Sequence, residues 1–356
     1  MSKQVKFAFD FFGFGNIGDD LMLEGFLTFW PKDLACYGQV APAQSRILNR
    51  RFSGIEWRDL QSTYEHKVWL GVGDTPIQVL SGPAMLQFLE KELLDPRPQQ
   101  RLRLLLGIGV EAEAVAEAPR FKRILSKVDY IWSRDHFSGE VLIDKFDVNE
   151  NKVVVSSDLA NSALKAIFGC PPQATRPVGL ALNLYCETRR WSSLCTVVSF
   201  LREQASKHKV IWLANEVRDF RNSEVHTFRQ IASLLNMRRK GETVDLVIPS
   251  NFATSVSMMV DHFSACQTVI SSRYHCILTA AWAGCQVAGI GRSSKIVALC
   301  KQLSIPCIAS GLSRHSLEAA AESSCIVPRE ALDALAQSAS LSIVGAARLA
   351  RQAIVN

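Results

Sequence analysis

The residues best suited to chemistry lie in one short stretch. Arg273 and His275 stand two residues apart, after the run Thr268 to Ile270 that predicts a buried strand. An extended backbone would place both side chains on one face. A fixed guanidinium beside a titratable imidazole suits a site that binds an anion and moves a proton. The alternative is an arginine in a surface ion pair and a histidine packed at a helix start.

The elements around this pair predict where it lies. Residues Ile277 to Ala283 predict a helix of small residues that Gly284 can end, and Gln286 to Ile290 predict the next strand. Ser271 and Ser272 therefore follow the end of a strand, where α/β sheets place their ligands.

A second group of polar residues follows the next strand. Gly291 to Lys295 begins a helix that should continue to Leu303. Free N–H groups at that start, with Ser294 and Lys295 beside them, could cradle a phosphate. An ordinary serine N-cap explains the same residues.

A glycine-rich segment near the N-terminus has the form G-x-G-x-x-G. It is Gly13 to Gly18, between the strand candidate Lys6 to Phe12 and a helix that starts with Asp19 and Asp20. Acidic residues in the first helical turn would repel the pyrophosphate of a dinucleotide. The next strand, near Leu34 to Tyr37, also lacks a terminal acidic residue for a ribose.

Two other interpretations of this segment stay open. It could be a tight strand-to-helix turn. It could also be an acceptor-site loop in which Gly15, Asn16 and Asp19 face a cleft.

Strands and helices alternate along the whole chain, with a proline-rich break at Phe168 to Pro177. Such alternation predicts parallel sheets covered on both faces. Several strands of the first half end in glycines or polar residues, among them Gly73, Gly107, Arg134 and Asp158, so we expect this rim to line a cleft. The expected parts are an N-terminal domain (1–168), a linker (169–177), a C-terminal domain (178–327) and a helical tail (328–356).

Composition excludes several classes of protein. The chain has 356 residues, 48% of them hydrophobic, and no uninterrupted apolar run approaches the ~18 residues of a membrane span. The net charge of +6 is dispersed, and its densest group, Arg238 to Lys240, has no interleaved aromatic residues, which argues against nucleic acid. Ten cysteines occur singly without metal-ligand spacing. This usage favours reduced thiols and a cytoplasmic location, with no metal. Asp10 interrupts the N-terminal apolar run Met1 to Phe12, and no small-residue cleavage site follows soon after, so we expect no signal peptide.

Four segments give the chain a likeness to the polysaccharide pyruvyl transferase family. The most specific is Ser272-Arg-Tyr-His275 with its helix, which is similar to the family's Ser-x-Arg-Leu-His segment. The others are Gly13 to Asp20, Ser133-Arg-Asp-His-Phe-Ser138 and Ser157-Asp-Leu-Ala160, and Lys295 falls where the family tends to carry a lysine. Tyr274 replaces a leucine, Leu159 a proline, and Gly71 to Thr75 a run of three glycines.

The resemblance implies two Rossmann-like α/β domains with mostly parallel sheets, which face each other across a cleft as in GT-B glycosyltransferases. The N-terminal domain would hold the acceptor and the C-terminal domain the donor. It also implies transfer of a pyruvyl group from phosphoenolpyruvate to a saccharide or lipid-linked saccharide, as a ketal, in bacterial cell-surface or exopolysaccharide biosynthesis. No cofactor is expected. Peripheral membrane contact and homo-oligomerisation stay open.

The resemblance and the chemistry of phosphoenolpyruvate together suggest roles for individual residues. His275 would be the general acid, and Arg273 and Arg134 would grip the anionic donor. Lys295, with Ser294, would hold the departing phosphate, and Ser272 would line the same site. Asp158 or Asp19 would be the base.

Two other functions fit the same architecture. One is a nucleotide-sugar glycosyltransferase that uses Glu216 or Asp219 to bind its nucleotide. The other is a saccharide-binding homologue without catalysis.

Overall fold

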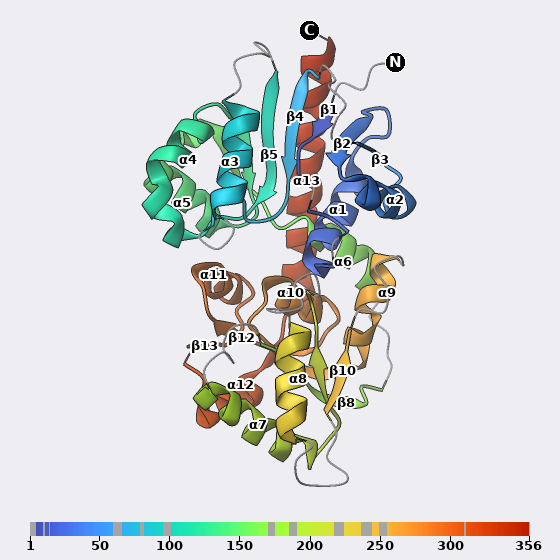
Figure 1. Ribbon diagram of the computed structural model, residues 1–356, viewed down its shortest axis with the longest axis vertical. Helices are drawn as coiled ribbons and strands as arrows, with labels where there is room; N and C mark the ends of the chain where they lie inside the picture. The colour runs from blue at the N-terminus through green and yellow to red at the C-terminus, as the bar shows by residue number, and fades with distance from the viewer. Residues whose placement is uncertain are drawn as a thin grey trace. The chain divides into compact units, whose positions relative to one another are not determined.

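The computed structural model of the chain forms two compact units (Figure 1). Unit 1 comprises Met1–Gly13, Asp19–Ala163 and Asp333–Asn356, and unit 2 comprises Phe14–Gly18 and Leu164–Leu332. The structure describes residues 5–9, 11–13, 15–59, 66–78, 82–94, 101–169, 175–184, 191–216, 224–235, 244–248, 255–309 and 311–355.

The units divide the chain differently from the expected linear domains. The boundary after Ala163 lies inside helix α6 (Ala160–Phe168), and the boundary after Leu332 lies inside α13 (Arg329–Val355). Residues 170–174 of the expected linker lie outside the described residues. The short segment Phe14–Gly18 belongs to unit 2, although its neighbours on both sides belong to unit 1.

Unit 1 contains a seven-stranded parallel sheet in the order β3-β2-β1-β4-β5-β6-β7. Its strands are β1 (Val5–Phe7), β2 (Cys36–Val40), β3 (Ile55–Asp59), β4 (Val68–Val72), β5 (Leu102–Ile108), β6 (Tyr130–Ser133) and β7 (Val153–Val155). The strand order reverses between β1 and β4, and in α/β sheets such a switch point is where ligands bind.

Unit 2 repeats this order with β10-β9-β8-β11-β12-β13, all parallel, while β14 pairs antiparallel with β12. The strands are β8 (Val178–Asn183), β9 (Val210–Leu213), β10 (Val244–Val247), β11 (Cys266–Ser271), β12 (Gln286–Gly291), β13 (Cys307–Ala309) and β14 (Cys325–Ile326). The switch point here lies between β8 and β11, and β11 is the strand that leads to Arg273 and His275.

Helices alternate with these strands and cover the sheets. Those that begin in the first half of the chain are α1 (Ile17–Phe29), α2 (Pro42–Arg51), α3 (Gly82–Leu93), α4 (Ala118–Leu125), α5 (His136–Phe146) and α6. Those that begin in the second half are α7 (Trp191–Ala205), α8 (Glu224–Leu235), α9 (Val256–Val260), α10 (Tyr274–Trp282), α11 (Ser294–Gln302), α12 (Arg314–Ser323) and α13. Short 3₁₀ helices occupy η1 (Ala112–Glu117), η2 (Glu150–Lys152) and η4 (Asp261–Ala265).

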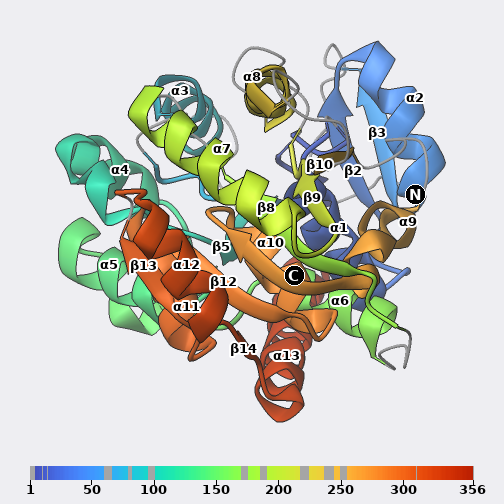
Figure 2. The same cartoon turned by 90° about the horizontal axis from the view of Figure 1, so that it is seen from below.

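The sheets are held by continuous apolar runs, as expected for strands buried on both faces. All five residues of β4 are buried. In unit 2, α7 and α12 pack against each other along one face of the sheet (Figure 2), where Leu194 and Leu317 join Leu182 and Ile290 in one core. Every residue of α10 is buried, because this small-residue helix lies against β11 and β12.

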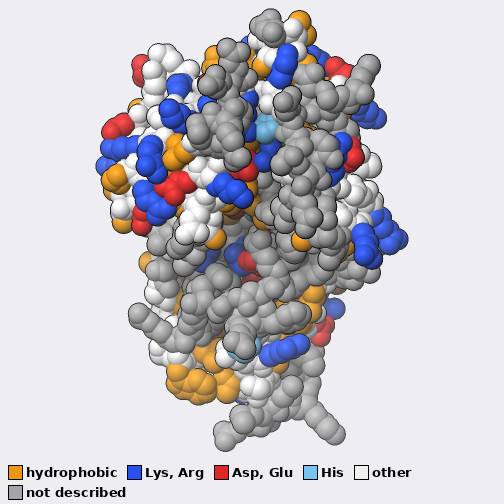
Figure 3. All heavy atoms as spheres, turned by 45° about the horizontal axis from the view of Figure 1, so that its top comes forward, with side chains coloured by type: hydrophobic (Ala, Val, Ile, Leu, Met, Phe, Trp, Pro, Cys, Tyr) orange, Lys and Arg blue, Asp and Glu red, His pale blue; other side chains and the backbone are white. Residues whose placement is uncertain are grey.

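Charged side chains are dispersed over the surface. On the face drawn in Figure 3, Lys and Arg side chains lie in small groups, several of them next to Asp or Glu. Among the described residues, Arg120 pairs with Glu90, and Lys122 pairs with Asp147. None of the helices in the described part of the chain is long and apolar enough to cross a membrane. The basic group Arg238 to Lys240 lies outside the described residues.

Candidate functional site

Helix α10 begins earlier than the sequence pattern predicts. Arg273 is its N-cap, with extended backbone angles (φ −111°, ψ 129°), and His275 is already its second residue. The predicted extended segment through both residues is therefore wrong, and the two side chains do not share a strand face. The cause is local. The hydroxyl of Ser271 accepts the N–H of Arg273 at 2.9 Å, and the Arg273 carbonyl accepts the N–H of Ile277 at 3.0 Å.

The imidazole of His275 lies directly against the backbone of Gly18. His275 is only 8% exposed. A Cβ atom added at Gly18 would stand 2.0 Å from His275 Nδ1, far inside van der Waals contact. The last glycine of the G-x-G-x-x-G segment is therefore required by the histidine, and the close approach is to a side chain of the same unit.

The glycine-rich segment is anchored to unit 2 by its backbone. The N–H of Ile17 donates to the carbonyl of Asn215 at 3.1 Å, and Asn16 forms an antiparallel bridge with Glu216. The side-chain oxygen of Asn16 accepts the N–H of Gly18 at 3.1 Å, as an N-cap of α1 does. Among the predicted acceptor residues, Asn16 thus also fixes the start of α1.

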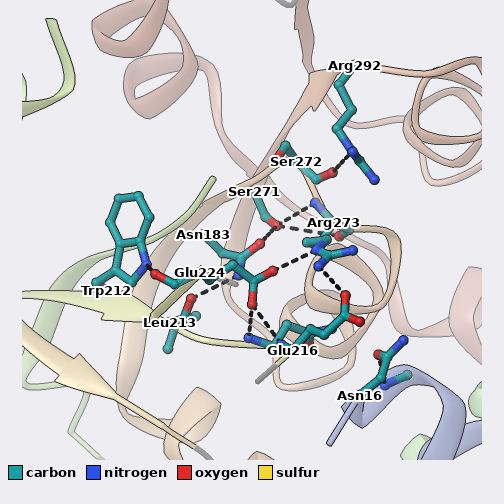
Figure 4. Close-up of polar contacts among 12 residues, drawn as sticks. Asn16, Asn183, Trp212, Leu213, Glu216, Glu224, Ser271, Ser272, Arg273 and Arg292 are labelled. Atoms are coloured by element: carbon teal, nitrogen blue, oxygen red, sulfur yellow. Dashed lines mark hydrogen bonds and ion pairs between the residues drawn. The ribbon is translucent and has the colours of Figure 1, made fainter. Parts of the chain in front are cut away.

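Arg273 lies between two carboxylates of unit 2 (Figure 4). Its Nε donates to Glu224 Oε1 at 2.6 Å, and its Nη2 pairs with Glu216 Oε2. One guanidinium with two carboxylates has a formal charge of −1. These contacts compensate the charge that was predicted to grip an anionic donor, so the anion-binding role of Arg273 stays a prediction.

Ser271 and Ser272 lie at the switch point of the second sheet. Ser271 Oγ donates to Asn183 Oδ1 at 3.0 Å, and Ser272 N donates to the Asn183 carbonyl at 2.9 Å. Both serines are fully buried, and the Ser272 carbonyl accepts Arg292 Nε at 3.1 Å. Arg292 follows β12, and its guanidinium extends beyond this carbonyl in Figure 4.

The predicted phosphate cradle is the start of α11. Ser294 and Lys295 are its first two residues, Ser293 is its N-cap, and all three are partly exposed. Arg292 precedes them, so two cations stand within four residues at the end of β12.

Two predicted site residues of unit 1 are brought together. Arg134 is 2% exposed, and its Nη1 lies 3.9 Å from Asp158 Oδ2, while its Nε lies 3.5 Å from Asp135 Oδ2. Asp158 also accepts the N–H of Ala160 at 2.9 Å. A Cβ at Gly109 would stand 2.3 Å from Arg134 Cζ, so this glycine makes room for the guanidinium.

The other acidic residues of the N-terminal segment have different surroundings. Asp20 accepts the N–H of Gly13 at 2.7 Å and pairs with Arg51 at 3.0 Å, with both side chains buried. It therefore holds the turn that Gly13 makes with a positive φ of 77°. Asp19 is 2% exposed in the first turn of α1, and Gly15 has a φ of 95°.

A buried cysteine lies next to His275 in helix α10. Burial raises the pKa of the Cys276 thiol, which therefore stays protonated beside His275. Among the described residues, no group of three or more His, Cys, Asp or Glu side chains could hold a metal ion. Asp219, a candidate nucleotide ligand, lies outside the described residues.

Three residues of the site escaped the sequence analysis. Glu224 and Asn183 contact Arg273 and Ser271 across 49 and 88 residues of chain, so no local pattern identifies them. Arg292 could have been identified from the sequence, because it stands in the predicted phosphate cradle directly after a strand.

Several solved structures share this fold at low sequence identity. S. aureus MnaA with UDP shares 10% identity at a TM-score of 0.65, covering 100% of this chain and 98% of that one. A UDP-GlcNAc 2-epimerase from Neisseria meningitidis with UDP-GlcNAc shares 11% identity (TM-score 0.56, 100% of each chain). A glycosyltransferase from Rickettsia africae shares 9% identity (TM-score 0.53, 100% and 99%). The fold is thus a two-domain α/β fold of the GT-B type.

Sequence comparison identifies the family. No curated protein matches the chain. The sequence model of the polysaccharide pyruvyl transferase family matches residues 16–294, which include the end of the glycine-rich segment from Asn16 onward, Arg134, Asp158 and the start of α10. The chain therefore belongs to the polysaccharide pyruvyl transferase family.

Proposed function

We propose that this protein transfers the pyruvyl group of phosphoenolpyruvate to a saccharide, forming a ketal and releasing phosphate. The observation that supports this most is the position of His275. It stands at the start of a buried helix, against Gly18 and beside the switch point of the second sheet, in a chain of this family. We expect the reaction to be cytoplasmic and to serve cell-surface or exopolysaccharide synthesis.

The donor has a carboxylate and a phosphate, and each needs directional cationic partners. In our proposal Lys295 and the N–H groups at the start of α11 bind the phosphate, together with Arg292. Arg134 remains the second predicted arginine for the donor. Arg273, already between Glu216 and Glu224, would orient the site more than it attracts the anion.

The chemistry then needs one acid, one base and two acceptor hydroxyls. His275 gives a proton to the methylene carbon of phosphoenolpyruvate, and C2 gains oxocarbenium character. The first hydroxyl attacks C2 and loses its proton to the base, for which Asp158 and Asp19 are the candidates. The second hydroxyl then attacks C2 as the C2–O bond to phosphate breaks, and its proton restores the acid. The proton that the base took from the first hydroxyl leaves with the phosphate. The products are the pyruvyl ketal and inorganic phosphate.

The acceptor is expected on the side of Gly15, Asn16 and Asp19, and it would be a saccharide or a lipid-linked saccharide. The second candidate function is a nucleotide-sugar glycosyltransferase. It is favoured by the carboxylate of Glu216, which stands three residues after the end of β9 and could bind the ribose of a nucleotide.

Donor binding separates these two candidates. We expect phosphoenolpyruvate to raise the melting temperature in a thermal shift assay, while UDP-sugars and CDP-glycerol leave it unchanged. Stabilisation by a nucleotide-linked donor alone would contradict the proposal and support the glycosyltransferase. Absence of turnover with either donor class, despite saccharide binding, would support the non-catalytic homologue.

Turnover tests the acid. We expect His275→Gln to lower phosphate release by ~10²–10⁴-fold, the usual contribution of a positioned general acid, and to leave phosphoenolpyruvate binding nearly unchanged. The exposed His315→Gln is the matched control and should keep full activity. Near wild-type release from His275→Gln would remove His275 from the mechanism.

A further inference from the structure

We propose that Glu224 is the positioning residue of this site, and that it sets the imidazole of His275 without touching the substrate. Glu224 is the first residue of α8, and its side chain is completely buried. Its Oε2 accepts the N–H groups of Asn215 and Glu216, both at 2.7 Å, and its Oε1 accepts Nε of Arg273 at 2.6 Å (Figure 4).

This buried carboxylate depends on its hydrogen bonds, which replace those that water would make. Removing a carboxylate from water costs several kcal/mol, which only good geometry and further hydrogen bonds offset. Short charge-assisted bonds of this kind are about twice as strong as neutral ones. The start of α8 adds the favourable end of a helix dipole. Glu224 therefore holds its three donors in one arrangement.

Two series of contacts connect Glu224 to His275. The first runs through Arg273, the N-cap of α10, whose carbonyl receives the first helical N–H at Ile277. The second runs through Asn215, whose carbonyl accepts the N–H of Ile17 at 3.1 Å. The residue after Ile17 is Gly18, against which the imidazole packs. Glu224 thus sets both the helix that holds His275 and the backbone wall beside it.

The consequence for catalysis rests on the proposed function. If His275 is the acid, a shift of its ring by about 1 Å should cost ~10²-fold in turnover. Binding of phosphoenolpyruvate should change little, because Arg292, Lys295 and the start of α11 follow β12. The side chain of Glu224 instead bonds Asn215, Glu216 and Arg273.

The test is Glu224→Gln, which keeps the shape of the side chain. Its single carbonyl oxygen cannot serve both Arg273 Nε and the two backbone N–H groups. We expect kcat to fall by about 100-fold, with the dissociation constant for phosphoenolpyruvate within about 3-fold of wild type. The matched control is Glu318→Gln, which removes a partly exposed carboxylate paired with Arg314 in the same unit, and it should behave as wild type.

A second measurement needs no substrate. We expect the ring signal of His275, assigned by its loss in His275→Gln, to shift in the NMR spectrum of Glu224→Gln. The amide of Ile17 should exchange with solvent at least about 10-fold faster. Absence of phosphate release from the wild type would contradict the proposed function, and these two signals would still test the role of Glu224.

Two results would overturn the inference. One is a folded Glu224→Gln protein with unchanged His275 and Ile17 signals. The other is that Glu224→Gln and the charge-retaining Glu224→Asp both fail to fold, because Glu224 would then be needed for the fold itself. If only Glu224→Asp folds, the same signals are read from that variant, and unchanged signals there have the same meaning.

Discussion

At the scale of single residues, the glycine-rich segment owes its composition to several different neighbours. Gly13 and Gly15 have positive φ angles of 77° and 95°, which side chains rarely adopt. Gly18 has an ordinary backbone, and it must be glycine because of His275. A formal G-x-G-x-x-G pattern therefore does not require a dinucleotide. Its third glycine here is explained by a contact within the protein.

The cysteines differ in reactivity for reasons of environment. All eight described cysteines are free thiols. A hydrogen bond from Cys300 lowers the pKa of the exposed Cys307 thiol to about 7, while burial raises the pKa of Cys266 to about 12 and that of Cys285 to about 11.

This difference predicts selective alkylation. At pH 7.5 we expect iodoacetamide to label Cys307 at least ~10³-fold faster than Cys266 or Cys285, because only the thiolate reacts. Cys300→Ala should slow labelling of Cys307 by about 10-fold, since its pKa would return toward the ordinary value. Cys300→Ser, which keeps a donor, is the control. Mass spectrometry of tryptic peptides gives the rates, and equal labelling of all three thiols would contradict the prediction.

At the scale of elements, helix α10 shows which local signals are dependable. Gly284 ends it as expected, with a φ of 72° and a hydrogen bond from Cys285 N to the Ala280 carbonyl. The start was predicted too late, because the turn at Arg273 depends on the hydroxyl of Ser271. Helix α2 and strand β3 were not predicted at all. Their short sequences mix polar and apolar residues, and they are regular in the fold where β3 pairs with β2 and α2 packs against β3.

His262 in the short helix η4 should make the stability of the protein depend on pH. Burial lowers the pKa of His262 to about 4, and its side chain is 17% exposed. Below its ordinary pKa near 6.5 the unfolded chain binds a proton that the folded chain takes up only near pH 4. The unfolded state therefore binds more protons in this window, and stability falls as the pH is lowered through it.

The expected contribution is about 2 kcal/mol between pH 7.5 and pH 5. Urea denaturation of wild type and His262→Gln at both pH values measures it, because the contributions of the carboxylates cancel in the comparison. His262→Gln should lose less stability than wild type on acidification. The same loss in both proteins would show that His262 is protonated in the folded state already at pH 5. His315→Gln, at an exposed position, is the control.

At the scale of the molecule, the same strand order occurs twice. In each sheet the strand order reverses beside the strand that comes first in the sequence, which is β1 in unit 1 and β8 in unit 2. His275, Ser272 and Asn183 gather at the second of these points. Arg134 and Asp158 pair at the ends of β6 and β7 in unit 1. The predicted catalytic residues thus follow strand ends in both units, as ligand sites of α/β sheets do.

The C-terminal helix belongs to a unit that begins at the other end of the chain. Residues 333–356 are part of unit 1, where Ala339, Ile343 and Ala346 of α13 are fully buried. The hydroxyls of Ser156 and Ser157 donate to the carbonyls of Ser338 and Leu335.

In a chain that is truncated after Leu332, unit 1 should therefore unfold before unit 2. The lost burial is worth roughly 5 kcal/mol or more, which is comparable to the stability of a domain. Hydrogen exchange should show β4 and β5 deprotected while β8 and β11 keep their protection. A chain ending at Arg351 retains these buried residues and should resemble wild type. Unchanged protection of β4 in the shorter chain would contradict the assignment of α13 to unit 1.

Local sequence patterns predict the α/β alternation, the buried strands, the family and the catalytic candidate His275. These depend on local patterns, such as the apolar run before Ser271 and the glycine after Ala283, which act over a few residues. The residues that contact each site residue became visible in the three-dimensional fold alone. The imidazole of His275 packs against Gly18, and Glu224 accepts hydrogen bonds from Arg273 and Asn215. These contacts form because the strand order of the second sheet brings distant strand ends together. Such contacts follow from the order and register of strands, which local pattern does not specify.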